Sequence, residues 1–237
     1  METCTQKNIQ QQTQKIKIFC VIPAYNEAAN IVSVINSVKP LVDKVIVIDD
    51  CSCDNTCLLA KKQNIIVLKH LVNRGQGAAL KTGTKYAIKE NADIIVHFDA
   101  DNQFLASEIK NVVKPIINGQ ADIVFGSRFL NQQNNISIPR IKKYILIPLA
   151  KLVNRLFLNV NLTDPQSGFR AMTKQTAKII NVQQDRMAHC SEILYQAIKH
   201  HLRIKEVPIT VIYHNFGQCF SDGLKILTDL FLAKFID

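Results

Sequence analysis

Short apolar runs rich in β-branched residues alternate with stretches of helical spacing through the first half of the chain. The apolar runs, which predict buried strands, are Ile16–Ile22, Lys44–Ile48, Ile65–Leu68, Asp93–Phe98 and Asp122–Phe125. The stretches between them, which predict helices, are Asn30–Val38, Asn55–Gln63, Gly77–Lys89 and Ser107–Ile117. Continuous apolar strands separated by helices are typical of a parallel sheet that is covered on both faces. The pattern therefore predicts a doubly wound α/β fold.

The alternation changes after Arg128, and the elements expected from there on are more varied. A long helix that mixes basic and apolar residues is predicted from Arg140 to about Leu158. The further predicted elements are a strand at Phe169–Met172, helices at Lys174–Ile180 and Cys190–His200, a strand at Ile204–Tyr213 and an amphipathic C-terminal helix at Gly223–Ile236. Residues 1–15 are rich in Gln, lack apolar periodicity and are expected to form a disordered tail. Residues 16–237 are expected to form a single domain, because no linker divides them.

Polar residues gather where three of the predicted strands end. The first strand leads into residues 23–27 (Pro-Ala-Tyr-Asn-Glu), the second into residues 49–56 and the fourth into residues 99–103. In an open parallel sheet, ligands bind beyond the carboxyl ends of the strands. Some of these side chains have a simpler explanation as helix N-caps, namely Asp54 or Asn55, as does Ser107 further along. The convergence of three clusters nevertheless predicts a ligand site at this edge of the sheet.

Asp99 and Asp101 are not explained by capping, because two carboxylates crowded at one strand end repel each other. A divalent cation removes that repulsion. Mg²⁺ or Mn²⁺ binds one or two carboxylates of a protein together with the phosphates of a substrate. The pair therefore predicts a metal site that serves a phosphate-bearing ligand.

The chain is basic, with 29 Lys and Arg against 19 Asp and Glu and a formal net charge of +10. Nucleic acid, an anionic membrane surface and a phosphate-bearing substrate would each suit that charge. Aromatic residues make up only 7% of the chain, Trp is absent, and no stacking motif argues for nucleic acid. Seven Cys without an export signal favour a reduced cytosolic setting, and the spacing of Cys51, Cys53 and Cys57 matches no zinc pattern. No apolar run approaches the roughly 18 residues that a bilayer requires.

The motifs at residues 23–27, 49–56 and 99–103 recur in a fixed order with three later ones. The later ones are Gly-Ser-Arg-Phe at 126–129, Asp-x-x-Ser-Gly-Phe-Arg at 164–170, and Glu192 ahead of Glu-Val-Pro at 206–208. In this order they resemble the signatures of family-2 glycosyltransferases, in particular the branch of dolichyl- and polyprenyl-phosphate mannosyl- and glucosyltransferases. The resemblance covers residues 16–236.

The resemblance implies a GT-A fold, a UDP- or GDP-linked hexose as donor, Mg²⁺ or Mn²⁺ as cofactor, and inversion at the anomeric carbon. It implies metal binding by Asp99 and Asp101, and catalytic roles for Asp101, Arg128 and Glu192. The residues that it places around the donor are Pro23, Tyr25, Glu27, Asp49, Asp50, Asp99, Ala100, Asp101, Gln103, Arg128 and Arg170. Of these, Arg128 would face a phosphate of the donor or of the acceptor.

The acceptor decides how Glu192 is interpreted. A lipid phosphate, whose second pKa lies near ~6, is already ionised at neutral pH and needs no general base, so Glu192 would orient or coordinate. A hydroxyl acceptor on a cell-surface glycan or lipid would make Glu192 a candidate base. We expect transfer to a polyprenyl phosphate, with the hydroxyl acceptor as one alternative and a catalytically silent nucleotide-sugar-binding protein as another.

Residues 123–163 contain no Asp or Glu and carry six basic residues: Arg128, Arg140, Lys142, Lys143, Lys151 and Arg155. A helix of this composition can lie on an anionic bilayer with its Lys stems snorkelling, or pack on the core with a basic solvent face. The same two interpretations apply to Gly223–Ile236. With a lipid acceptor, the first interpretation predicts a cytoplasmic enzyme that is peripheral at the cytoplasmic membrane face.

Two departures from the family pattern bear on the donor and on a loop. Mannosyltransferase relatives carry Arg and a Ser-Lys pair around the position of Gly217, and their absence here puts GDP-mannose in doubt. The usual small residue after the Asp pair is Cys51, which we expect to be tolerated sterically. Dinucleotide binding is excluded as a rival, because Gly75-x-Gly77 lacks the third glycine and follows the third strand rather than the first.

Overall fold

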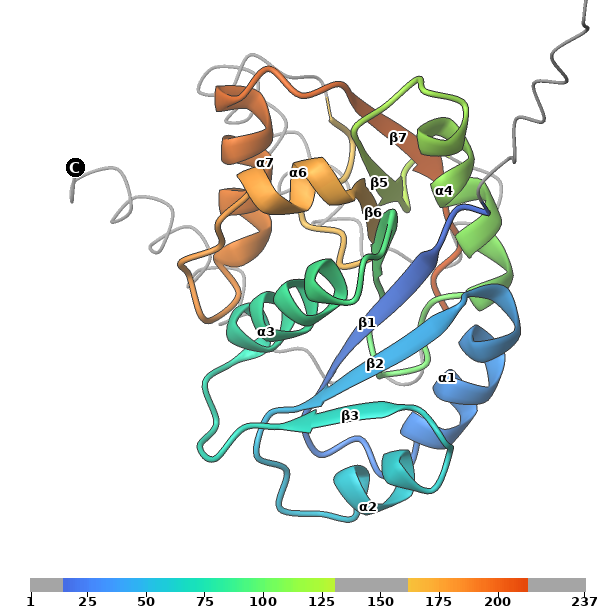
Figure 1. Ribbon diagram of the computed structural model, residues 1–237, viewed down its shortest axis with the longest axis vertical. Coiled ribbons are helices and arrows are strands. Elements are labelled where there is room, and N and C mark those ends of the chain that lie inside the picture. Colours follow the sequence, from blue (N-terminus) through green and yellow to red (C-terminus); the bar gives the residue numbers. More distant parts are fainter. Residues whose placement is uncertain (1–14, 131–161, 213–237) are drawn as a thin grey trace, which may run out of the picture.

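In the described part of the chain, one sheet of seven strands runs in the order β3-β2-β1-β4-β6-β5-β7 (Figure 1). The computed structural model describes residues 15–130 and 162–212 of the 237-residue chain. The strands are β1 (Ile18–Ala24), β2 (Lys44–Asp49), β3 (Ile66–Lys69), β4 (Ile94–His97), β5 (Ile123–Ser127), β6 (Arg170–Thr173) and β7 (Ile204–Pro208). The α-helices are α1 (Ile31–Val38), α2 (Thr56–Lys61), α3 (Gln76–Lys89), α4 (Ile109–Ile117), α6 (Lys174–Ile179) and α7 (His189–Lys199), with 3₁₀ turns η1 (Lys39–Leu41) and η2 (Ala106–Glu108).

The sheet is mostly parallel, as the apolar runs predict. Strand β1 pairs in parallel with β2 and β4, β2 with β3, and β5 with β7, whereas β6 is antiparallel to both β4 and β5. The chain moves outward from β1 to β3 and then crosses to β4 on the other side of β1. The resulting switch point between β1 and β4 is where an open α/β sheet forms its ligand crevice.

Helices cover both faces of the sheet, which explains why β1, β2, β4 and β5 are mostly apolar. Helices α1, α2 and α4 pack on one face and α3, α6 and α7 on the other (Figure 1). In β1, Cys20 and Ile22 belong to the first core and Phe19 and Val21 to the second, and all four are buried. A Cβ on Gly83 would lie 2.3 Å from Val21, so this glycine lets α3 approach β1 closely. None of the helices in the described ranges is long and apolar enough to cross a bilayer.

The predicted boundaries differ from the observed ones by one or two residues at most strands, and β1 and β7 show the largest differences. Strand β1 begins at Ile18 and runs to Ala24, because its ladder with β2 continues until Ala24 is opposite Asp49. Strand β7 ends at Pro208, whereas the apolar pattern predicts a strand as far as Tyr213. Beyond Pro208 the chain crosses towards another loop, and Val211 pairs with Phe104. The predicted helices at residues 140–158 and 223–236, and residues 1–14 of the expected tail, lie outside the described residues.

Cys51 has a left-handed backbone, with φ of +63°. This conformation costs a residue with a side chain about 1 kcal/mol or more, but costs glycine little. We predict that Cys51→Gly keeps or raises the free energy of unfolding, by up to about 1 kcal/mol, and that Cys51→Val lowers it by about 1–3 kcal/mol. Urea denaturation of the two variants measures both effects.

Cys53 is the matched control, because it is exposed and is not among the residues with positive φ. Cys53→Gly should bring no gain in stability, since glycine only adds freedom to the unfolded chain there. A Cys51→Gly variant less stable than Cys53→Gly would contradict the strain at residue 51.

Candidate active site

The loops after β1 and β2 are joined by side chains that accept backbone hydrogen bonds. The amide of Asn26 donates to the hydroxyl of Ser52 at 3.0 Å, and the amide of Glu27 donates to the hydroxyl of Thr56 at 2.7 Å. Asp54 accepts from the amide of Ala28 at 3.0 Å. The motif at residues 49–56 thus holds the motif at residues 23–27 in place at the end of the sheet.

The capping explanation applies to Asp54 and fails for its neighbour and for Ser107. Asp54 accepts from the amide of Thr56, the first residue of α2, at 2.9 Å. Asn55 makes no side-chain cap to α2. Ser107 lies inside η2, and neither η2 nor the helix α4 that follows it has a side-chain N-cap.

Asp49 and Asp50 are neighbours with different surroundings. Asp50 is buried and accepts from the amides of Arg74 and Gly75 at 3.0 and 2.6 Å and from Nδ1 of His70 at 2.7 Å. It therefore holds the loop before α3. Asp49 is fully buried, and neither of its carboxylate oxygens has a hydrogen-bond partner among the described residues, although Nζ of Lys69 lies 3.9 Å away. Two unsatisfied acceptors at the end of β2 leave Asp49 as the better candidate to bind a donor molecule.

Asp99 follows the end of β4, and its carboxylate is enclosed on two sides. It accepts from Nε2 of Gln76 at 2.8 Å, and a Cβ on Gly168 would lie 2.2 Å from its Oδ2. Loss of hydration and the nearby charge of Asp101 raise the pKa of Asp99 to about 7. Asp101 accepts from the amide of Gln103 at 3.0 Å. The repulsion that the sequence predicts between the two carboxylates is therefore present.

The acid pair fits a divalent cation. A cation beside Asp99 and Asp101 would relieve the repulsion that raises the pKa. Within residues 15–130 and 162–212, no cluster of three or more His, Cys, Asp or Glu could hold a metal by itself. Two carboxylates would suffice for Mg²⁺ or Mn²⁺ if a bound diphosphate completed the coordination.

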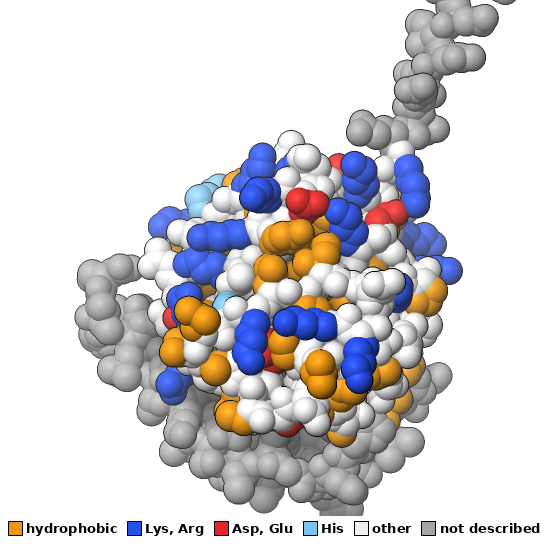
Figure 2. Space-filling model, turned by 60° about the horizontal axis from the view of Figure 1, so that its bottom comes forward, with side chains coloured by type: hydrophobic (Ala, Val, Ile, Leu, Met, Phe, Trp, Pro, Cys, Tyr) orange, Lys and Arg blue, Asp and Glu red, His pale blue; other side chains and the backbone are white. Residues whose placement is uncertain are grey.

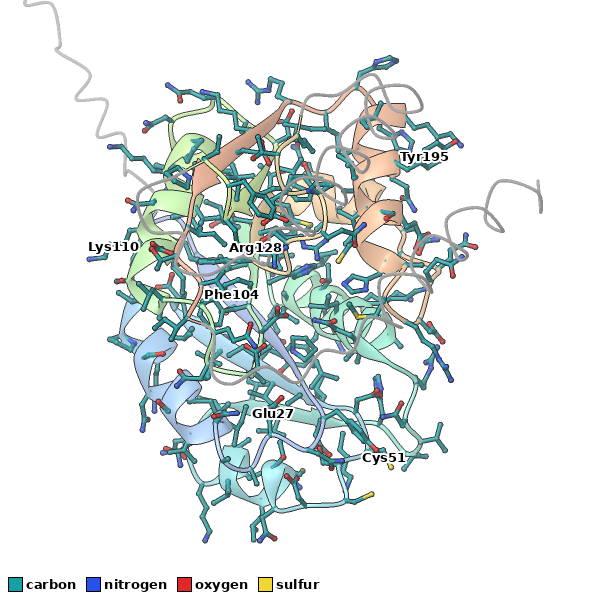
Figure 3. The ribbon with its side chains drawn as sticks, turned by 180° about the vertical axis from the view of Figure 1, so that it is seen from behind. Glu27, Cys51, Phe104, Lys110, Arg128 and Tyr195 are labelled. Carbon is teal, nitrogen blue, oxygen red and sulfur yellow. The ribbon has the colours of Figure 1, made fainter. Side chains whose placement is uncertain are left out.

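Glu27 lies near the acid pair, on the loop after β1 that also carries Tyr25. Burial raises the pKa of Glu27, and the charges of Asp101 and Asp54 raise it further. Tyr25 is exposed, whereas Pro23, Ala24 and Ala100 are buried. Figure 3 shows Glu27, Phe104 and Arg128 along the middle of the view, with Tyr195 of α7 at the periphery.

Arg128 is held at the end of β5 by a fork of hydrogen bonds to one carboxylate. Its Nε and Nη2 donate to the two oxygens of Asp164 at 2.6 and 2.8 Å, and Asp164 is buried. Glu206 of β7 in turn accepts from the amides of Thr163 and Asp164, each at 2.9 Å. The guanidinium is partly exposed and rigidly oriented.

Arg170 lies in β6 with its side chain fully buried, behind the acid pair. Its Nη2 donates to Sγ of Cys190 at 3.2 Å and its Nε to the carbonyl of Gly168 at 3.4 Å, while its Nη1 has no partner among the described residues. Its positive charge lowers the pKa of Asp99. Two of its three guanidinium nitrogens are engaged within the core, which favours an electrostatic effect on the acid pair over the direct donor contact that the resemblance implies.

Glu192 of α7 binds a loop. Its carboxylate accepts from the amides of Gln183 and Gln184, each at 2.8 Å, and from Nε2 of Gln196 at 3.2 Å. These bonds favour the orienting role over that of a general base.

Sequence reasoning missed four residues that shape the site: Gln76, Asp164, Gly168 and Glu206. Asp164, Gly168 and Glu206 stand inside the motifs but have no role assigned from sequence. Gln76 lies between two glycines, and this tight start of α3 is the signal that could have pointed to it. Their effects depend on contacts between segments far apart in sequence, such as the 2.8 Å bond from Gln76 to Asp99.

Comparisons with known proteins agree with this geometry. The family model described as "Glycosyl transferase family 2" matches residues 19–179. The UDP-N-acetylglucosamine–dolichyl-phosphate N-acetylglucosaminyltransferase of Methanococcus voltae is 37% identical over 241 residues, which cover 92% of this chain and 96% of that protein. The polyprenol monophosphomannose synthase of Mycolicibacterium smegmatis is 26% identical over 222 residues, which cover 89% of this chain and 83% of that protein.

A similar fold occurs in a solved structure. The crystal structure of glucosyl-3-phosphoglycerate synthase from Mycobacterium tuberculosis, in complex with Mn²⁺, UDP-glucose and phosphoglyceric acid, superimposes with a TM-score of 0.72. It is 21% identical, and the match covers 91% of this chain and 78% of that chain. The predicted GT-A fold is thereby confirmed.

The raised pKa of Asp99 predicts a pH-dependent effect on stability. In the unfolded chain this carboxyl ionises near pH 3.8, but in the fold it ionises near pH 7. Ionised Asp99 therefore costs stability above about pH 7, and the cost disappears as the pH falls towards 4. Without metal, Asp99→Asn should raise the free energy of unfolding at pH 8 by up to about 4 kcal/mol and change it little at pH 4.

Asp43 is the control of opposite sign for that experiment. A hydrogen bond from Lys15 and one from the amide of Ile18 lower its pKa. Asp43→Asn should therefore lose stability at pH 8 and less at low pH. Urea denaturation at several pH values measures both variants, and a loss of stability in Asp99→Asn at pH 8 would contradict the electrostatic strain at Asp99.

The contacts of Glu206 predict an effect on the loop that holds Arg128. Glu206→Gln leaves one acceptor oxygen for the amides of Thr163 and Asp164, so the free energy of unfolding should fall by about 1–2 kcal/mol. Glu90→Gln is the matched control, because among the described residues Glu90 forms a partly exposed pair with Lys44, and it should lower stability less than Glu206→Gln does. Thermal unfolding compares them, and equal losses would show that Glu206 does not anchor the loop.

Proposed function

The chain belongs to glycosyl transferase family 2, and from that premise we propose that it transfers a hexose or N-acetylhexosamine from a UDP-linked donor to a polyprenyl phosphate. It is a glycosyltransferase, and the acceptor and donor are our inference. The observation that carries the proposal is the acid pair Asp99 and Asp101 at the switch point of the sheet, where the charge of Asp101 contributes to the raised pKa of Asp99.

The donor nucleotide would bind at the ends of β1 and β2. The two buried oxygens of Asp49, which accept no hydrogen bond from the described residues, are suited to accept N–H or O–H groups of a base or ribose. Asp50 is engaged with the loop before α3, so we assign it to positioning rather than to contact with the nucleotide. The exposed ring of Tyr25 lies on the adjoining loop. Similarity to a UDP-N-acetylglucosamine-dependent relative favours uridine over guanosine diphosphate.

The diphosphate would bind beside Asp99 and Asp101, together with Mg²⁺ or Mn²⁺. A bound divalent cation would neutralise the negative charge that develops on the leaving diphosphate. Gln76 and Gly168 fix the position of the Asp99 carboxylate, and the amide of Gln103 fixes that of Asp101. These residues therefore hold the acid pair ready for the ligand.

A phosphate acceptor agrees with the positions of Arg128 and Glu192. Arg128 presents an oriented, partly exposed guanidinium at the end of β5, where it can bind a phosphate of donor or acceptor. Glu192, the candidate base for a hydroxyl acceptor, binds loop amides instead. A lipid phosphate is already ionised at neutral pH and needs no base. We therefore favour the phosphate acceptor over the hydroxyl acceptor.

A lipid acceptor places the enzyme at a membrane surface. We propose that residues 16–237 act as one catalytic domain that is peripheral at the cytoplasmic face. The acid-free segment at residues 123–163, most of which lies outside the described residues, would add to the attraction for anionic lipids and phosphates.

A thermal-shift screen with UDP-N-acetylglucosamine, UDP-glucose and GDP-mannose tests the donor, with and without Mn²⁺ or Mg²⁺. A UDP-sugar should raise the melting temperature only with the cation, because binding stabilises the fold by mass action. Asp101→Asn should remove the shift and lower transfer to polyprenyl phosphate by at least about 100-fold. Glu90→Gln, at the opposite edge of the sheet, should change neither. A shift with GDP-mannose but with neither UDP-sugar would overturn the proposed UDP-linked donor. Full activity of Asp101→Asn would overturn the proposed metal site.

A further inference from the structure

The loop between β3 and α3 presents two adjacent apolar side chains to solvent. Leu71 is 94% exposed and Val72 is 63% exposed. Single exposed apolar residues are common on protein surfaces. Leu71 and Val72, in contrast, are adjacent at the tip of one loop. Almost none of the Leu71 side chain is covered.

The exposure of this pair follows from a loop that is held firmly from behind. The amides of Arg74 and Gly75 donate to the buried carboxylate of Asp50, and the amide of His70 donates to the carbonyl of Asp49 at 2.9 Å. Sγ of Cys51 lies 3.4 Å from the carbonyl of Leu71. The backbone on both sides of the pair is therefore fixed, and the fold itself keeps Leu71 and Val72 outward.

A second loop, from far along the chain, adjoins the first and has the same character. Arg74 pairs with Asp185 at 3.1 Å, and the amide of Ala78 donates to the carbonyl of Asp185 at 3.1 Å. The next two residues are the exposed Arg186 and Met187, the latter 50% exposed. We call Leu71, Val72, Arg74, Arg186 and Met187 the α3 rim. Figure 2, in which the β3 end of the molecule is turned forward, shows hydrophobic side chains bordered by Lys and Arg.

The α3 rim borders the candidate active site. Gln76, two residues after Arg74, donates to Asp99 at 2.8 Å. The loop that carries Leu71 and Val72 also binds Asp50 at the end of β2. Whatever surface the rim contacts will therefore lie next to the acid pair.

We propose that the α3 rim inserts into the interface of an anionic lipid bilayer, with Leu71, Val72 and Met187 at the acyl boundary and Arg186 at the lipid phosphates, while the pair of Arg74 with Asp185 joins the two loops. Apolar tips flanked by basic residues suit such an interface. Three apolar side chains are too few for a stable protein partner, which covers roughly 800 Å² on each side. The proposal rests on the proposed function, since a lipid-borne acceptor brings this edge to the membrane, and it assigns the contact to a loop outside the basic segment at 123–163.

Vesicle sedimentation of the full chain tests the rim. The double variant Leu71→Ser/Val72→Ser should bind vesicles of phosphatidylglycerol and phosphatidylcholine at least about tenfold more weakly than the parent. The matched control is Ile16→Ser/Ile117→Ser, because Ile16 and Ile117 are 39% and 46% exposed and line one hollow away from the strand-end edge. The control should bind like the parent. Equal binding of both double variants would overturn the proposal.

A fluorescent reporter tests the depth of the contact without removing it. The chain contains no Trp, so Leu71→Trp places a single indole at the rim and Ile117→Trp places one at the control site. Indole is favoured at the membrane interface. Vesicles should shift the emission of the first variant to shorter wavelength and leave the second unchanged. A shift in neither variant, or the same shift in both, would overturn insertion through the rim.

The two proposals fail in different ways. In the thermal-shift screen, Leu71→Ser/Val72→Ser should respond to donor and cation like the parent. It should also retain transfer to a short, water-dispersed prenyl phosphate while losing it with vesicle-borne polyprenyl phosphate. If the parent showed no thermal shift with any donor and cation, the proposed function would be refuted, but the vesicle-binding result would still hold. Unchanged transfer from vesicles in the double variant would refute the rim.

Discussion

The backbone amides of the loops at the strand ends need acceptors, and the acidic and hydroxyl side chains of the motifs supply most of them. Asp50, Thr56, Glu192 and Glu206 each accept from amides of a loop other than their own. A buried amide without a partner costs about 1–3 kcal/mol, so these side chains decide whether the loops hold their shape. Within the described residues, the loops that carry residues 26–27, 74–75, 163–164 and 183–184 are anchored in this way.

The same constraint separates structural acids from those left for a ligand. Asp49 has no hydrogen-bond partner in the described residues, and Asp99 accepts from a side-chain amide. Asp49 follows the alternation of β2 onto the side of Val45 and Val47, whereas Asp50 follows Ile46 and Ile48 onto the opposite side, towards α3. Asp49 and Asp50 are adjacent in sequence but lie on opposite sides of the sheet. The first is therefore a candidate ligand-binding carboxylate, and the second anchors a loop.

The sequence predicts the strands and helices well because burial on both faces demands continuous apolar runs, and that demand is visible in any one segment. It predicts the acid pair for a similar reason, since both carboxylates lie within three residues. The roles of Arg170 and Glu192 are of another kind, because they depend on which distant segment covers each side chain. An Arg side chain is a common phosphate ligand. However, β6 lies between β4 and β5, and the side chain of Arg170 is buried in the core. No spacing within residues 164–170 reveals that.

The buried position of Arg170 gives the acid pair a charge balance that a ligand can complete. Burial and the charge of Arg170 lower the pKa of His189 to about 4 and that of His97 well below its usual range, so both imidazoles are neutral at pH 7. Arg170 therefore supplies the permanent positive charge behind Asp99, and His189 lowers the pKa of Asp99 less than Arg170 does. That charge lowers the pKa of Asp99 without cancelling the effects of burial and of Asp101, which still hold it near 7. More positive charge behind Asp99 would ionise this carboxyl fully but would also repel a divalent metal. Without the charge of Arg170, Asp99 would be protonated to a greater extent and would be a poorer metal ligand. The fold lies between these limits, and a cation arriving with a diphosphate removes the remaining repulsion.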